Sequence, residues 1–381
     1  METDRTYPVP QVPVAPSAIT GNGAQSRFAT LMVATCNLLN LAQPGRHFYD
    51  GQDPYSQNEF ERKVEWLGAR FKVLNADVIA VQEVWDEVAL RAAVARSGLQ
   101  YGFVSVPGAE NGPGQHGAQG TPRVGIVSRL KVESVLSLVD FPAAAVVDVP
   151  GLGPHTRFER PPLFTTLRMK HGQAVGVITA HLKSKRPKYL QDAEGRPLED
   201  PDDPTVQAIG SLRSLIMRAG EALALRLKVV ELLHRTRLPL IVMGDLNDGP
   251  HSVTTQLIAA TSQVAYDKGA RDNALFSAWD VMGEAALRRD VAFSHIHQGY
   301  PEVLDQVLVS EEFVATSRAS IGDVKRVDVF NDHLFEGRDR SRSDHGFVRA
   351  LLRLRLPDPV QRHGQEQGPF CSNPGAQHEP T

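Results

Sequence analysis

The chain has 381 residues, of which 41% are apolar and 22% charged, and its net charge is -3. This composition is typical of a large globular α/β domain with tails, and it argues against a protein that coats nucleic acid through overall positive charge. No segment approaches the roughly 20 consecutive apolar residues of a membrane span. The two cysteines, Cys36 in an apolar segment and Cys371 in a polar one, exclude a zinc site built on thiolates and argue against a disulfide framework.

The two ends of the chain differ in composition from the middle. Residues 1–26 are rich in proline and small polar residues, so we expect a disordered leader, and residues 357–381 are expected to form a disordered tail. Between them, residues 27–356 show continuous patterning without a long linker, which predicts one domain. The N-terminus lacks the basic and apolar segments of a secretory signal, so we expect a cytoplasmic protein, with secretion left open.

The predicted elements begin with a strand over Phe28–Asn37. In the next segment, apolar residues recur at intervals of four and three, which predicts a helix that ends at Asn75. Asp86 is expected to cap a second helix that ends near Gly98. Further strands are predicted over Val78–Val81, Arg123–Ser128, Leu163–Met169, Ala174–Ala180, Pro239–Met243, Val303–Val309, Ile321–Val327 and Phe347–Leu354.

A third helix is expected to end over Glu221–His234, with Leu223, Leu227 and Val230 on one stripe. Many strands with few intervening helices favour two sheets packed on one another with helices outside. Two long loops are expected, over Pro107–Pro122 and Lys183–Pro204, and loops of this length are usually functional or mobile.

Polar residues interrupt the apolar strands at several places. Such groups are costly to bury unless they pair, bind a metal or line a wet cleft. Each has an ordinary explanation by itself, as a turn residue, a solvated strand end or a local hydrogen-bonding group. Together they predict one polar site, made from Asn37, Glu83, His181, Asp245, Asn247, Asp305, Asp344 and His345.

These residue types suit the hydrolysis of a phosphate ester. A hard cation such as Mg²⁺ prefers oxygen ligands, which Glu83, Asn37 and Asp344 can offer. Asp245 can orient or deprotonate a water molecule, and Asn247 can donate to a phosphate oxygen.

The two histidines and a basic segment complete this interpretation. His181 and His345 can donate hydrogen bonds or protons, and Asp305 can fix the orientation of a histidine. The basic residues Lys183, Lys185 and Arg186 directly follow His181 and would hold substrate phosphates if their loop folds over the metal. A solvated charged loop is the alternative.

The motifs resemble those of the endonuclease/exonuclease/phosphatase superfamily, whose members share a deoxyribonuclease I-like fold. The matching segments are Thr35–Leu41, Val81–Glu83, Thr179–Leu182, Gly244–Asn247 and Ser343–His345, in the family's order. One difference is Leu304-Asp305-Gln306, where the family commonly has Ile or an aromatic residue beside the acid.

The resemblance implies a fold and a set of roles. The fold is α/β (α+β), with two packed, mostly antiparallel sheets flanked by helices in a four-layer sandwich. The site would hold Mg²⁺ or Mn²⁺ on Glu83 with Asn37 and Asp344, and its catalytic group would be His181, Asp245, Asn247, Asp305 and His345. The motifs look most similar to a bacterial, nuclease-like branch of the superfamily.

Three functions remain open from the sequence. The first is a nuclease that cleaves DNA or RNA, which the basic segment favours. The second is a phosphatase or phosphodiesterase acting on a small-molecule or lipid phosphoester, of the inositol phosphate or sphingomyelin type. The third is an inactive member that binds a phosphorylated partner, but a binding protein has no need of the full set of site residues. No protein partner is evident, and nucleic acid is the expected substrate.

Overall fold

The computed structural model describes residues 27–48, 51–109, 121–192, 195–264, 266–283, 291–337 and 339–356. The predicted leader (1–26), the predicted tail (357–381) and most of the predicted loop Pro107–Pro122 lie outside the described residues. Among the helices described, none is both long and apolar enough to cross a membrane.

The first large sheet, called sheet A, is built around the longest strand. Its strands in spatial order are β15 (Gly322–Phe330), β16 (Phe347–Arg355), β1 (Phe28–Leu41), β2 (Val78–Val84), β4 (Arg123–Ser128) and β3 (Phe103–Ser105). β1 lies in the middle, antiparallel to β16 and parallel to β2. The other pairs of sheet A are antiparallel.

The second large sheet, called sheet B, faces sheet A. Its strands in spatial order are β11 (Leu275–Ser277), β14 (Asp305–Ser310), β10 (Leu240–Asp245), β9 (Ala174–His181), β8 (Leu163–Arg168) and β5 (Lys131–Ser137). β9 and β10 are parallel, and the remaining pairs are antiparallel. The expected mostly antiparallel sheets are therefore confirmed.

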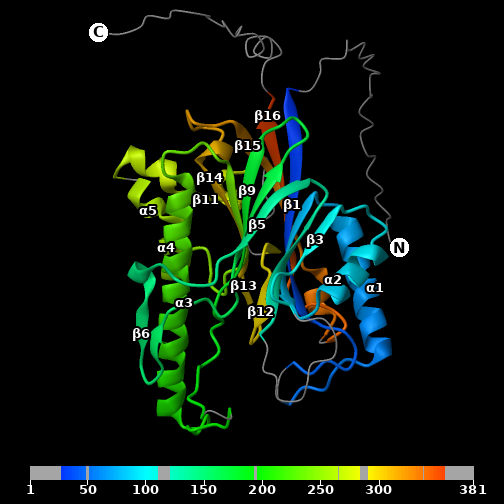
Figure 1. Ribbon diagram of the computed structural model, residues 1–381, viewed down its shortest axis with the longest axis vertical. Coiled ribbons are helices and arrows are strands. Elements are labelled where there is room, and N and C mark those ends of the chain that lie inside the picture. Colours follow the sequence, from blue (N-terminus) through cyan, green and yellow to red (C-terminus); the bar gives the residue numbers. More distant parts are fainter. Residues whose placement is uncertain are drawn as a thin grey trace, which may run out of the picture.

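Helices cover the outer face of each sheet. The helices are α1 (Gln57–Leu74), α2 (Glu87–Arg96), α3 (Pro204–Leu233), α4 (Val253–Ala259), α5 (Thr261–Val264) and α6 (Ala278–Val281). Figure 1 shows α1 and α2 on one side of the paired sheets and α3 and α4 on the other. The expected four-layer sandwich is confirmed.

Short elements complete the fold. Two hairpins stand apart from the large sheets, β6 (Val147–Val149) with β7 (Gly153–His155) and β12 (His295–His297) with β13 (Tyr300–Glu302). The 3₁₀ turns are Ala143–Ala145, Lys268–Asn273, Glu311–Phe313 and Asp332–Phe335.

The alternation of side chains along β1 explains why a sheet can lie between two layers. Leu31 and Val33 point into the apolar layer between sheets A and B, whereas Ala34, Cys36 and Leu38 pack against α1 and α2. Successive side chains of a strand face opposite sides, so a strand that is buried on both faces must be apolar throughout. The polar residue Asn37 breaks this pattern at the edge of the core and belongs to the site described below.

One sequence-based expectation for this region is confirmed and one needs correction. The expected loop Lys183–Pro204 ends where α3 begins, at Pro204, with Asp203 capping the 30-residue helix. Its buried face is Ala222, Leu225, Val229 and Leu233, whereas the predicted stripe of Leu223, Leu227 and Val230 is only half-buried. The four buried residues belong to the core cluster that α3 shares with strands of sheet B.

Asp86 precedes α2 as predicted, but its carboxylate makes no capping hydrogen bond. Instead it accepts hydrogen bonds from the backbone N of Gln43 at 2.8 Å and from Arg46 Nη1 at 3.1 Å. A buried carboxylate gains more from a charged partner than from one helix amide. The predicted end of α1 at Asn75 is confirmed, with Asn75 in the left-handed region.

Candidate active site

Site residues from both sheets meet at one end of the sandwich. His181 ends β9 and Asp245 ends β10, and these two residues are direct neighbours in the parallel register. Asp305 begins β14 and is the antiparallel neighbour of Asp245. Asn37 enters from β1 of sheet A, and all four side chains are buried. The expected convergence of strand-end polar residues is thus present in the structure.

Gly244 permits the close packing of β9 and β10 at this end. Its φ is +153°, and a Cβ at this position would lie 1.9 Å from the carbonyl oxygen of Ala180. Only glycine avoids that collision. The glycine therefore places the Asp245 carboxylate directly beside His181.

One carboxylate oxygen, Asp245 Oδ2, is the meeting point of the site. Asn37 Nδ2 donates to it at 3.1 Å, His181 Nε2 lies 3.5 Å away and His345 Nε2 lies 3.9 Å away. The other oxygen, Oδ1, accepts from the backbone N of Asn247 at 2.8 Å. Burial raises the pKa of Asp245, while the nearby His345 lowers it.

Asn247 holds this arrangement from the other side. Its Nδ2 donates to the carbonyl oxygen of Leu182 at 2.9 Å, and its φ of 54° lies in the left-handed region. Asparagine tolerates this conformation better than most residues. In this rotamer Asn247 links the end of β9 to the Asp245 loop, and its predicted donation to a phosphate oxygen remains a prediction.

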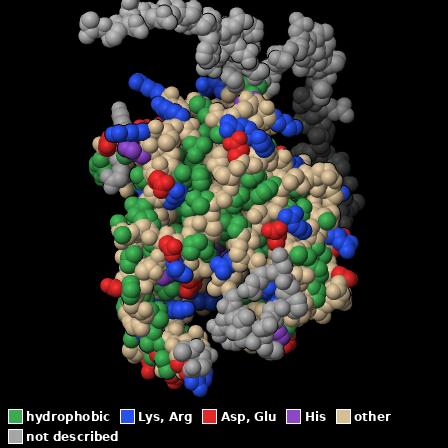
Figure 2. Space-filling model, in the orientation of Figure 1, with side chains coloured by type: hydrophobic (Ala, Val, Ile, Leu, Met, Phe, Trp, Pro, Cys, Tyr) green, Lys and Arg blue, Asp and Glu red, His purple; other side chains and the backbone are tan. Residues whose placement is uncertain are grey.

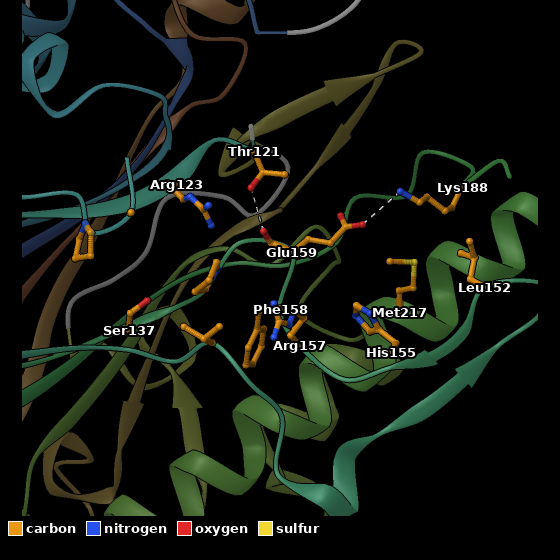
Figure 3. Close-up of a pocket in the computed structure, with 14 residues that line it drawn as sticks. Thr121, Arg123, Ser137, Leu152, His155, Arg157, Phe158, Glu159, Lys188 and Met217 are labelled. Carbon is orange, nitrogen blue, oxygen red and sulfur yellow. Dashed lines mark hydrogen bonds and ion pairs between the residues drawn. The ribbon is translucent and has the colours of Figure 1, made fainter. Parts of the chain in front are cut away.

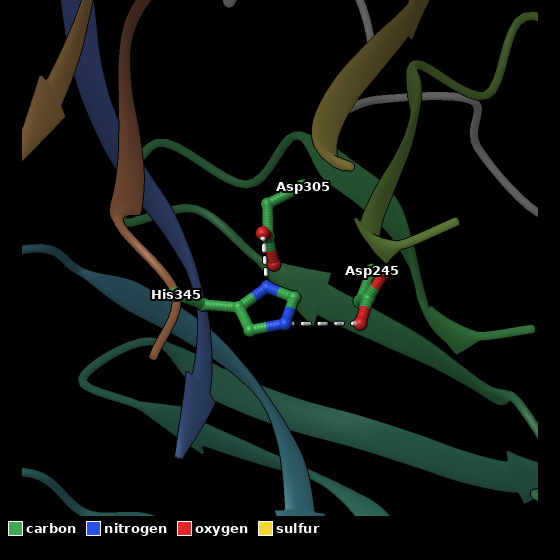
Figure 4. A group of neighbouring side chains, drawn as sticks. All are labelled: Asp245, Asp305 and His345. Carbon is green, nitrogen blue, oxygen red and sulfur yellow. Dashed lines mark hydrogen bonds and ion pairs between the residues drawn. The ribbon is translucent and has the colours of Figure 1, made fainter. Parts of the chain in front are cut away.

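His345 and Asp305 form a buried pair. His345 Nδ1 lies 2.7 Å from Asp305 Oδ2, and Figure 4 shows the ring placed between Asp305 and Asp245. Although burial lowers the pKa of His345, the charges of Asp305 and Asp245 outweigh it, and the pKa lies well above its usual value. A histidine held in this way is protonated near neutral pH and can act as a proton donor.

The backbone around this pair is also fixed. Ser294 Oγ accepts from the backbone N of Asp305 at 2.9 Å, and the backbone N of His345 donates to Ser343 Oγ at 3.0 Å. His333 Nε2 lies 2.9 Å from the carbonyl oxygen of His345. Neither Ser294 nor His333 belongs to any of the motifs recognised in the sequence.

His181 has the opposite electrostatic environment. Burial lowers the pKa of His181 well below its usual value, and the neighbouring Arg160 lowers it further. Arg160 Nη1 lies 2.8 Å from His181 Nε2, and its Nη2 donates to the carbonyl oxygen of Leu182 at 2.6 Å. The pKa values of the two histidines are therefore shifted in opposite directions, a division that suits acid–base chemistry. Arg160 was not predicted, since it belongs to none of the recognised motifs.

Glu83 reaches the site because β2 is irregular there. The register of β2 shifts between Val81 and Val84, and the φ of Glu83 is +59°. Bulges of this kind redirect a side chain and are frequent beside active sites. Glu83 Oε1 accepts from Asn37 Nδ2 at 3.3 Å, and Oε2 accepts from the backbone N of Asn40 at 3.1 Å.

Two carboxylates and an amide offer a place for a hard cation. Burial raises the pKa of Glu83, and the negative charge of Asp344 raises it further, so the two carboxylates repel one another. Asp344 is exposed, whereas its neighbours Ser343 and His345 are buried. A divalent cation relieves such repulsion, and oxygen donors suit Mg²⁺ or Mn²⁺. The residues present therefore fit the expected metal.

Asn37 contributes differently from the expectation in this structure. Its Oδ1 accepts from the backbone N of Leu39 at 3.0 Å, while its Nδ2 bridges Glu83 and Asp245. In this orientation Asn37 organises the two carboxylates, and it would present an oxygen to a cation after rotation of the amide. Its role as a metal ligand stays a prediction.

A second group of possible ligands lies deeper. One ligand atom each of Asp245, Asp305 and His345 lies within 4.8 Å of the others. A cation here would compete with the hydrogen bond between His345 and Asp305. Glu83 with Asp344 therefore provides the better oxygen-rich position.

The predicted phosphate-binding residues occupy the loop after β9. Lys183 is buried, and its Nζ lies 3.8 Å from Glu159 Oε2. Lys185 Nζ lies 2.7 Å from Glu302 Oε1 on β13. The carbonyl oxygen of Arg186 accepts from Ser214 Oγ, which ties this loop to α3. Two of the three predicted cations are thus paired with acids, and their contact with phosphate stays a prediction.

A cavity of about 670 Å³ opens beside Arg160. Figure 3 shows Arg123, Arg157 and Lys188 around it, with Glu159 directed toward Lys188. The lower half of the face in Figure 2 is hollowed, and Lys and Arg side chains gather at the edge. None of the site residues described above lines this cavity, but its wall includes Glu159 and Pro161, the two neighbours of Arg160 in the chain.

The loop that bears Asp344 is anchored by α1. Lys63 is fully buried, and its Nζ donates to the carbonyl oxygen of Arg340 at 2.9 Å. Arg340 in turn donates to both carboxylate oxygens of Glu59, at 2.7 and 2.8 Å. These contacts were not predicted, because the partners lie more than 270 residues apart along the chain.

A four-layer sandwich with this polar centre between its sheets defines a phosphoester hydrolase. A model of the endonuclease/exonuclease/phosphatase family matches residues 35–345, and the chain belongs to that family. Comparison with curated protein sequences finds no match.

The chain is also similar to solved structures. The chain is similar to an endonuclease/exonuclease/phosphatase from Bacteroides vulgatus, with 14% identity and a TM-score of 0.51, covering 86% of this chain and 99% of that one. A mannosyl-6-phosphatase from Bacteroides thetaiotaomicron shows 15% identity and a TM-score of 0.48, covering 84% of this chain and 99% of that one.

Proposed function

We propose that the chain is a divalent-metal-dependent phosphodiesterase, with nucleic acid as its leading candidate substrate. One observation carries the proposal: Asp245 Oδ2 lies between Asn37, His181 and His345, which come from distant parts of the chain. A buried carboxylate surrounded by nitrogen groups is suited to hold and deprotonate a water molecule. Members of this family generally use divalent metals.

The metal would be held by Glu83 and Asp344, with Asn37 beside them. When bound, such a cation neutralises charge on the phosphate and positions it for attack. The unusual backbone of Glu83 and the hydrogen bonds to its carboxylate fix this ligand before metal arrives. Fixed charged groups stabilise a transition state without having to reorganise.

In this proposal Asp245 and His345 transfer the protons, and His181 contacts the phosphate. Asp245 accepts the proton of the attacking water, while protonated His345, held by Asp305, donates to a phosphate oxygen or to the leaving group. His181 is neutral, and together with the Arg160 guanidinium it faces the remaining phosphate oxygens. This division assigns acid and base roles according to the opposite pKa shifts of the two histidines.

The choice of substrate rests on the cations of the 670 Å³ cavity and of the loop after β9. Arg123 and Arg157, which line this cavity, favour an extended polyanion such as DNA or RNA. The ion pairs of Lys183 with Glu159 and of Lys185 with Glu302 favour the second candidate, a small-molecule or lipid phosphoester. These pairs satisfy cations that a polyanion would otherwise contact.

The proposal is tested with purified protein and Mg²⁺ or Mn²⁺. Bis-p-nitrophenyl phosphate should be hydrolysed, and EDTA should abolish the reaction. Asp245→Ala and His345→Ala should each lower kcat by about 10²–10⁴-fold, whereas the control His234→Ala, at the exposed end of α3, should not. Full activity in either site variant refutes the mechanism.

A substrate panel then distinguishes the two candidates. Plasmid DNA, RNA, an inositol phosphate and sphingomyelin are compared at equal metal concentration. A kcat/KM that is highest for DNA or RNA supports the nuclease, and one that is highest for a small or lipid phosphoester supports the second candidate.

A further inference from the structure

A separate cavity of about 270 Å³ lies between the sheets, behind the His345–Asp305 pair. Its wall is mainly apolar, with Val307 from β14, Val327 and Val329 from β15, Val348 from β16 and Trp279 from α6. His345 does not line it. For comparison, an engineered apolar cavity of about 150 Å³ is large enough to bind benzene.

One polar group in this wall lacks a partner. Asp305 is 1% exposed and lines the cavity, and its Oδ1 has no hydrogen-bond partner within the described part of the chain. The other oxygen, Oδ2, is used by His345. A buried carboxylate oxygen without a donor is costly, so a donor placed in the cavity would be bound favourably.

The other buried polar groups of the wall are already engaged. Ser294 Oγ accepts from the backbone N of Leu304 and of Asp305, at 3.0 and 2.9 Å. Gln306 Nε2 donates to the carbonyl oxygen of Asp248 at 2.7 Å. The cavity therefore combines an apolar wall with one carboxylate oxygen that lacks a donor. A matching ligand has an apolar body and one hydrogen-bond donor.

We propose that this cavity is a binding site for a small apolar molecule that carries one cationic hydrogen-bond donor, such as a primary arylalkylammonium ion. The apolar body fills the space between the valines and Trp279, and the ammonium group donates to Asp305 Oδ1. Hydrogen bonds between a charged donor and a carboxylate are roughly twice as strong as neutral ones. The site lies apart from the face where His345, Asp245 and Glu83 meet.

Occupation of this site acts on catalysis through Asp305. An ammonium group on Oδ1 competes with His345 Nδ1, 2.7 Å from Oδ2, for the same carboxylate, so the ring is held less firmly in its place beside Asp245. The ligand does not occupy the place of the phosphate ester. Turnover therefore falls while KM for the substrate stays the same, a consequence that rests on the proposed function.

Benzylamine is the probe for the binding step, and toluene is its matched control because it has the same ring without the donor. Titration of the full chain, followed by calorimetry or by protein-observed NMR, should show saturable binding of benzylamine at least about tenfold tighter than that of toluene. Equal affinities for the two compounds, or no saturable binding of benzylamine at millimolar concentration, overturn the proposal.

A cavity-filling variant locates the site. Val327→Phe adds a ring to the cavity wall and should abolish benzylamine binding, whereas Val73→Phe, on the exposed face of α1, should not. If the first variant fails to fold by circular dichroism, Val307→Met fills the same space with a flexible side chain. Unchanged benzylamine affinity in a folded cavity-filling variant overturns the proposal.

The binding readouts need no enzymatic activity, so they separate this proposal from the proposed function. If bis-p-nitrophenyl phosphate is not hydrolysed but benzylamine binds and Val327→Phe abolishes binding, the cavity site stands and the function fails. If hydrolysis occurs and saturating benzylamine leaves kcat unchanged, the coupling through Asp305 is refuted.

Discussion

The change Asp305→Asn isolates the charge of the Asp305–His345 pair. Asparagine keeps nearly the same shape and can still accept from His345 Nδ1, but it removes the negative charge 2.7 Å from the ring. A hydrogen bond to a charged group contributes about 1.5–3 kcal/mol. Because about 1.4 kcal/mol corresponds to tenfold in rate, we expect kcat to fall by roughly 10–150-fold.

The pH dependence gives a sharper test than the rate alone. Asp305 is the first of the charges that hold the pKa of His345 well above its usual value against the effect of burial. Protonated His345 is lost as pH rises through that raised pKa, so the basic limb of the pH–kcat profile should move to lower pH in Asp305→Asn. The assay is hydrolysis of bis-p-nitrophenyl phosphate at saturating metal.

The contribution of the Asp305–His345 pair to the unfolding free energy should also decrease as pH rises. A raised pKa in the folded state means that the pair stabilises the fold fully below the ordinary pKa of histidine and loses this contribution as pH rises through the raised pKa of His345. The difference in unfolding free energy between wild type and Asp305→Asn should therefore shrink at alkaline pH. The control is Asp328→Asn, which breaks an ion pair with Arg349, whose side chain also contacts the end of α1 at the carbonyl oxygen of Leu74. An unmoved basic limb, or a kcat within about twofold of wild type, refutes the reasoning.

Three further changes test other parts of the site. Glu83→Gln should raise the Mg²⁺ concentration needed for half-maximal activity, and an unchanged metal titration removes Glu83 from the ligand set. Lys63→Met should destabilise the fold by about 1–3 kcal/mol, because the carbonyl oxygen of Arg340 loses the 2.9 Å hydrogen bond from Lys63 and keeps only the 3.3 Å one from Tyr55. Denaturant unfolding measures this, with exposed Lys72→Met as control. Gly244→Ala should lower the unfolding free energy by about 2–3 kcal/mol or more, because the added Cβ meets backbone at 1.9 Å. The control Gly249→Ala, whose Cβ meets nothing within 4 Å, should be tolerated. Equal losses of unfolding free energy in both variants contradict the close packing of β9 and β10.

The strands were predictable because burial imposes a pattern that survives in one sequence. β4 has the predicted bounds, Arg123–Ser128, and β9 differs from the prediction only by including His181 at its end. β1, however, continues four residues past Asn37. In its last part Leu39 and Asn40 have backbone conformations in the left-handed region, which local propensity does not predict.

The site was predictable as a set of residues but not as a geometry. Asp305 was expected to orient a histidine, and the structure pairs it with His345 despite the unusual Gln306 beside it. Arg160 and Ser294 could not be found from the sequence, because an arginine before two prolines and a lone serine carry no distinguishing pattern. Their contacts depend on how the strands pair over long distances in the chain.

The origin of the site in two sheets has a consequence for how activity arises during folding. Asn37 of sheet A and Asp245 of sheet B are 208 residues apart, yet they share one hydrogen bond. Neither half of the sandwich holds enough of the constellation to cleave an ester by itself. The chain therefore becomes able to hydrolyse its substrate only when the two halves dock, and the partly unfolded chain is inactive. The appearance of turnover during refolding would therefore report when the two sheets dock.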